Sequence, residues 1–88
     1  MHKTMRNLNK LFSPNGQLRI DDDHLYTGDW HTITVSSDAI FRSLMNGSVD
    51  VLIRDNLSEK TVKSTDQPLT GRFTTIQLSS GVIYANRN

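Results

Sequence analysis

The sequence predicts an all-β fold, either a small β-sandwich or a barrel of five to seven short strands, with an internal pseudo-two-fold repeat and an extended N-terminal arm. Three observations predict it: an ungapped internal repeat, alternation of apolar and polar residues, and turn signals spaced about every ten residues. Thr, Ser and Asn are plentiful, which suits strands and turns better than helices.

The repeat relates residues 27–40 to residues 70–83 at a constant offset of 43 positions, with no gap. Seven of the fourteen positions are identical, and the single Trp of the first copy becomes Phe in the second. Two copies of one local sequence imply one backbone path used twice around a shared core. We therefore expect the two units to be related by an approximate two-fold axis.

Both repeat units alternate as strands do, and one face of each carries an aliphatic pair. The predicted core residues are Ile33, Val35, Ile76 and Leu78. The aromatic residues Trp30 and Phe73 fall on the opposite face in a regular strand. Either they cap a second apolar surface, or a bulge at the preceding glycine turns them inward. In both cases we expect them to be packing or interface anchors.

The segments around the repeat are assigned less directly. Residues 1–24 are expected to form the arm, ordered against a partner or frayed, and residues 25–88 the single β domain. The first twenty residues carry basic but no acidic side chains. We expect the electrostatic contacts of the arm to be made by Arg6, Lys10 and Arg19.

The middle of the protein has two alternatives. Residues 38–45 fit a short amphipathic helix ending at Gly47, or a strand. The strand is favoured because Asn46-Gly47 is a strong hairpin signal, which would join residues 40–45 to a strand over residues 48–53. Residues 55–68 are polar and charged, and predict an exposed loop with a possible short strand at residues 60–63.

Size and composition bound the function. The 88 residues make one domain with a small core, and the absence of Cys excludes disulfides and thiolate metal sites. The hydrophobic fraction is 35% and the mean hydropathy −0.47, so we expect a homo-oligomer or growth onto a larger assembly. No stretch is long and apolar enough for a membrane span, and the N-terminal residues lack the apolar run of a secretory signal, so the cytoplasm of the producing cell is expected.

Catalytic and metal chemistry find little support in the residue pattern. The run Asp21-Asp22-Asp23-His24, followed by His31, suggests a carboxylate–imidazole metal site, but its spacing matches no known loop and a solvated turn is the favoured interpretation. Serines are common, yet no nucleophile-elbow sequence is present. We expect no enzymatic activity, no cofactor, no metal and no small-molecule substrate.

A single-strand nucleic-acid-binding β-barrel is an alternative. Trp30 and Phe73 would be its stacking rings. The basic residues beside them would be Arg42, Arg54 and Arg72. The net charge of +1 and the scattered basic residues favour a packing role for the two aromatic residues, so nucleic acid is not an expected partner.

The C-terminal run LTGRFTTIQLSSGVIYAN resembles the ending of a group of small virion proteins of tailed bacteriophages, in which glycine, an aromatic, isoleucine and an aliphatic residue recur at fixed spacing. The second copy of the pattern is carried by Gly71, Phe73, Ile76, Leu78, Ser80, Gly81, Ile83 and Ala85. The first copy is carried by Gly28, Trp30, Ile33, Val35, Asp38, Ala39 and Ile40. The similarity runs from Thr27 onward.

The resemblance implies a non-enzymatic virion structural protein, in the first place a capsid decoration or cement protein located in virions assembled in the host cytoplasm. The implied partners are other copies of the protein, as a trimer at three-fold positions, and the major capsid protein. A tail, fibre or head-completion component is the alternative within the virion. The basic arm would then reach an acidic patch on a neighbouring coat subunit.

Overall fold

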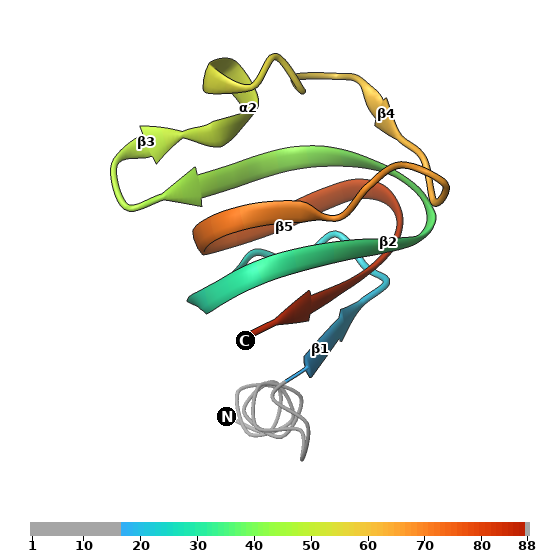
Figure 1. Cartoon of the computed structure of the whole chain (residues 1–88), viewed down its shortest axis with the longest axis horizontal. Helices are drawn as coiled ribbons and strands as arrows, with labels where there is room; N and C mark the ends of the chain where they lie inside the picture. The colour runs from blue at the N-terminus through green and yellow to red at the C-terminus, as the bar shows by residue number, and fades with distance from the viewer. Residues whose placement is uncertain (1–16, 88) are drawn as a thin grey trace.

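The computed structural model describes residues 17–87 and shows one antiparallel sheet of five strands with a single helical turn (Figure 1). The elements in sequence order are β1 (Gln17–Ile20), β2 (Tyr26–Asn46), β3 (Val49–Asp50), α2 (Val51–Arg54), β4 (Thr61–Val62) and β5 (Leu69–Asn86). The strand order is β1-β5-β2-β3, and β4 pairs with β2. The predicted all-β class is confirmed.

Two long strands, β2 and β5, make up most of the sheet. They have 21 and 18 residues, so the expectation of uniformly short strands is wrong for them. Each is long enough to contain a complete repeat unit, and each bends strongly along its length (Figure 1). The strand alternative for residues 38–45 is confirmed, because β2 continues without interruption to Asn46.

The two long strands pair with each other twice. Residues 26–33 of β2 pair with residues 69–76 of β5, and residues 32–45 of β2 pair with residues 75–86 of β5 in a different register. As a result Ile76 has Tyr26 as its partner on one side and Leu44 on the other. The middle of β5 therefore lies between the two ends of β2. This arrangement requires the sheet to curl, and the curled sheet encloses its apolar face.

The pairing is nearly two-fold symmetric. Trp30 pairs with Phe73, its own counterpart 43 positions later. The flanking pairs exchange under the same shift, since Thr27 pairs with Thr75 and Thr32 pairs with Thr70. A pseudo-two-fold axis therefore passes between the two aromatic residues. The predicted two-fold relationship between the repeats is therefore seen directly in how the residues of β2 and β5 pair.

Bulges explain how the aromatic residues reach the core. The register of β2 shifts on both sides of Trp30. Trp30 and Ile33 are then both buried, although they are three positions apart, and Phe73 and Ile76 repeat this spacing. The inward rotation is the correct alternative for the two aromatic side chains, each of which is 1% exposed.

The core of the described residues is larger than the composition suggests. Seventeen hydrophobic residues are buried, and no buried side-chain nitrogen or oxygen among residues 17–87 lacks a hydrogen-bond partner. The predicted core residues Ile33, Val35, Ile76 and Leu78 all belong to it. The expectation that this unit needs other copies to hide its apolar side chains does not hold for residues 17–87, because the curled sheet supplies its own second layer.

Part of the expected arm belongs to the domain. Strand β1 pairs with the end of β5, and its residues Leu18 and Ile20 are 1% and 0% exposed. The boundary expected at residue 24 therefore lies too late in the sequence. Arg6 and Lys10 of the expected arm lie outside the described residues.

The segment after the hairpin differs from the prediction. Gly47 and Ser48 form the turn, β3 lasts two residues, and the backbone then enters α2. The predicted strand over residues 48–53 is wrong because Asp50 caps a helical turn, accepting hydrogen bonds from the backbone N–H groups of Leu52 (3.0 Å) and Ile53 (3.4 Å). The possible short strand near residue 61 is present as β4.

Candidate interaction surface

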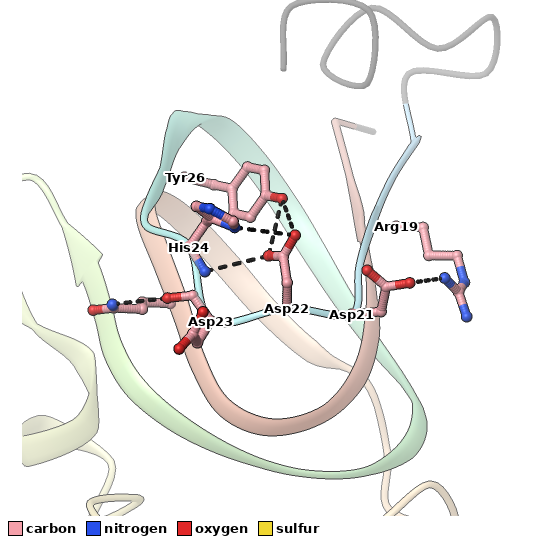
Figure 2. Close-up of polar contacts among 7 residues, drawn as sticks. Arg19, Asp21, Asp22, Asp23, His24 and Tyr26 are labelled. Atoms are coloured by element: carbon pink, nitrogen blue, oxygen red, sulfur yellow. Dashed lines mark hydrogen bonds and ion pairs between the residues drawn. The ribbon is translucent and has the colours of Figure 1, made fainter. Parts of the chain in front are cut away.

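The acidic loop between β1 and β2 is organised by one carboxylate (Figure 2). Both oxygens of Asp22 accept the Tyr26 hydroxyl at 3.0 Å, and one also accepts the backbone N–H of His24 at 3.2 Å. The His24 ring nitrogen Nδ1 lies 3.2 Å from the same carboxylate. Tyr26 is buried, so these contacts fasten the loop to the core. Asp22 therefore has a structural role in shaping the turn.

The neighbouring aspartates are used separately. Asp21 pairs with Arg19, and the backbone carbonyl of Asp23 accepts a hydrogen bond from the Gln77 side chain at 3.0 Å (Figure 2). The His31 ring is engaged elsewhere, because its Nδ1 hydrogen-bonds the carbonyl oxygen of Arg87. Across residues 17–87 no group of three or more His, Asp or Glu side chains is placed to hold a metal ion.

Arg19, expected to contact a partner, has neighbours within its own domain. It lies on β1 opposite Tyr84 of β5, with about half of its side chain exposed. Hydrogen bonding to the Tyr84 hydroxyl and to the Asp21 carboxylate raises the pKa of the guanidinium. The Arg19 side chain remains solvated, but part of its charge is already balanced by Asp21.

The aromatic and basic residues of the nucleic-acid alternative are not assembled into one platform. Trp30 and Phe73 are each 1% exposed, so neither ring face is open to a base. Arg72 pairs with Asp29 at 3.2 Å, which is its symmetry counterpart 43 residues earlier.

The other two basic residues of that alternative lie in different elements. Arg42 is an exposed residue of β2, and Arg54 ends α2. The Arg54 guanidinium bonds Asp55 at 3.0 and 3.1 Å and lowers the pKa of that carboxyl.

An exposed apolar corner lies where β3 meets α2. We call it the β3–α2 corner and define it by Val49 and Ile53, which are 43% and 74% exposed. Val51 and Leu52 between them are buried and anchor the turn to the core. Leu57 packs against the core, with its N–H bonded to the carbonyl of Leu52 at 2.8 Å.

Sequence reasoning missed this corner. A strand over residues 48–53 places Val49, Val51 and Ile53 on one face, where all three share one environment. The helical turn separates them, burying Val51 and turning Ile53 to solvent. The signal that could have shown this is Asp50, a favourable N-cap residue immediately before the apolar run.

Comparison with known proteins gives no relative: no family model, no curated protein and no solved structure matches this sequence. Between residues 17 and 87 there is no helix of the length and apolar character needed to cross a membrane.

Proposed function

We propose that the protein is a non-enzymatic structural component of a tailed-phage virion, of the capsid decoration or cement type. In this proposal it attaches to the major capsid protein and to neighbouring copies of itself, and it stabilises the shell through those contacts. The observation that carries the proposal is the β3–α2 corner: a domain that buries seventeen hydrophobic residues leaves Ile53 74% exposed on a capped, anchored turn.

The repeated sequence pattern supports a rigid scaffold for this corner. In both copies most of the aromatic and aliphatic positions of the pattern are buried, as seen for Trp30 with Phe73 and for Ile33 with Ile76, whereas Ile40 is half-buried. Most of the apolar residues through which the sequence resembles phage virion proteins thus belong to the core. A scaffold of this kind suits a protein whose task is to hold a binding corner in place.

The corner suits a partner with a complementary apolar recess. Burying a side chain such as Ile53 completely contributes about 1.5–3 kcal/mol, and a shell with many copies multiplies such a contribution. The basic residues Arg6 and Lys10 precede the edge strand β1 in the sequence, so in this proposal they supply electrostatic attraction to an acidic coat surface.

Quantitative mass spectrometry of virions purified from cells that produce the protein tests the proposal. Hundreds of copies per particle would support decoration, whereas a dozen or fewer would support a tail, fibre or head-completion role. Absence of the protein from purified particles would overturn both.

A pair of variants tests the corner itself. Ile53→Asp is expected to leave the fold intact and to reduce retention on particles. Leu25→Asp is the matched control, because Leu25 is also an exposed hydrophobic residue, at 57%, but lies outside the corner. Equal retention of the two variants would contradict the assignment of the corner as the attachment site.

A further inference from the structure

The hairpin turn between β2 and β3 contains an Asn-Gly sequence whose backbone is held by a side chain from β5. The backbone N–H of Gly47 donates to the Thr74 hydroxyl oxygen at 2.9 Å. The same hydroxyl donates to the carbonyl oxygen of Met45 at 3.3 Å. One threonine therefore bridges the two residues on either side of Asn46.

Asn-Gly pairs are chemically reactive because glycine offers the least hindered backbone nitrogen. The Gly47 nitrogen attacks the amide carbonyl carbon of the Asn46 side chain, forming the new carbon–nitrogen bond of a succinimide ring. The bond from that carbon to the amide nitrogen breaks, and ammonia leaves, carrying away the proton that Gly47 loses. Water then opens the succinimide at either carbonyl and leaves aspartate or isoaspartate.

The surroundings of Gly47 permit this reaction. The residue is exposed, its φ is +59°, and a methyl group built on it would meet no atom within 4 Å. Steric crowding therefore does not protect the pair. The reacting nitrogen is restrained by its hydrogen bond to Thr74, which must break before the nitrogen can lose its proton and turn toward the Asn46 side chain.

We propose that Asn46 is a site of spontaneous deamidation and that the Thr74 hydroxyl slows this modification in the folded protein. The consequence reaches the β3–α2 corner, because Asn46 pairs with Val49. Isoaspartate lengthens the backbone by one carbon within that pair, and either product adds a negative charge beside an apolar side chain.

Wild-type protein, Thr74→Val and Thr74→Ser are incubated folded in mildly alkaline buffer, and conversion at each Asn is followed by peptide mapping with detection of isoaspartate. Loss of one hydrogen bond is expected to speed conversion of Asn46 about two- to tenfold in Thr74→Val. Thr74→Ser keeps a hydroxyl and is expected to stay near the wild-type rate. Asn46→Asp has no amide to lose and provides the blank for that peptide.

Two references separate a local effect from general loosening of the fold. Thr75→Val removes the adjacent hydroxyl without touching Gly47, and its Asn46 rate should match the wild type. The second Asn-Gly pair, Asn15-Gly16, should convert at one rate in all variants. An unchanged Asn46 rate in Thr74→Val, or an equal acceleration in Thr75→Val, would overturn the proposal.

Discussion

Trp30 and Phe73 are direct cross-strand partners and the symmetry counterparts of each other, and both are 1% exposed. The Trp30 ring also lies against Gly28 of its own strand, where a methyl group would come within 2.8 Å of the ring. A methyl group on Gly71 would lie 4.0 Å from the Phe73 ring, which is an ordinary contact distance. In the first copy the glycine-x-aromatic pattern thus has a physical basis, because the Trp30 ring folds back over a residue with no side chain.

Truncation of either aromatic residue should strongly destabilise the domain. Trp30→Ala and Phe73→Ala are each expected to lower the free energy of unfolding by about 3–5 kcal/mol, because each leaves a large cavity in the core. Urea unfolding followed by circular dichroism measures the change. Thr34→Ala, at an exposed position of β2, is the control and should change stability by less than about 0.5 kcal/mol.

The aromatic pair should also be energetically coupled. In a double-mutant cycle, the two truncations together are expected to cost less than the sum of the single changes, by about 0.5–1.5 kcal/mol. If the two changes in unfolding free energy are strictly additive, the rings stabilise the core independently, and their contact with each other contributes no stability of its own.

The repeat and its alternation were sufficient to predict the all-β class, the approximate two-fold relationship and the aliphatic core. They did not predict that each repeat unit would lie in one long bent strand, or that β2 and β5 would pair with each other along two separate stretches. Alternation reports which face a residue occupies, but it carries no information on long-range register. The position of Ile76 between Tyr26 and Leu44 is a property of the curled sheet and not of any local sequence.

Gly81 takes the place of Asp38 in the second repeat unit, and we expect this glycine to be irreplaceable. Its φ is +93°, and a methyl group there would lie 2.4 Å from the carbonyl oxygen of Asp38 and 2.5 Å from the Cα atom of Ala39. These are backbone atoms of the paired strand and cannot move aside cheaply. Gly81→Ala is therefore expected to lower the free energy of unfolding by at least about 2 kcal/mol in urea titrations.

Gly47→Ala is the matched comparison for Gly81→Ala. Gly47 also has a positive φ, of +59°, but open space around its Cα. Only the backbone preference is lost there, so the expected change is about 1 kcal/mol. Equal destabilisation by the two substitutions would contradict a close approach of the strands at Gly81.

The cap of the short helical turn accounts for the main error in the predicted secondary structure. Asp50→Ala removes the acceptor of two backbone N–H groups and should lower the free energy of unfolding by about 1 kcal/mol. Asp50→Asn keeps an acceptor oxygen and should retain most of that stability. If both variants unfold at the wild-type urea concentration, the side chain does not hold the turn.

Two experiments distinguish a structural role of the acidic loop from a metal-binding role. Tyr26→Phe removes the hydroxyl that both Asp22 oxygens accept, and should destabilise by about 1–3 kcal/mol because the acceptor is charged. Addition of calcium or zinc should not raise the midpoint of thermal unfolding of the wild-type protein. A metal-dependent rise of several degrees would show instead that the loop is a ligand site.

The double use of β2 and β5 is the central claim, and nuclear Overhauser spectroscopy of isotope-labelled protein tests it most directly. Backbone protons of Ile76 should give cross-strand contacts to Tyr26 and also to Leu44, one on each side of the strand. Contacts from Ile76 to only one of these residues would contradict the curled sheet and the two-fold arrangement built on it.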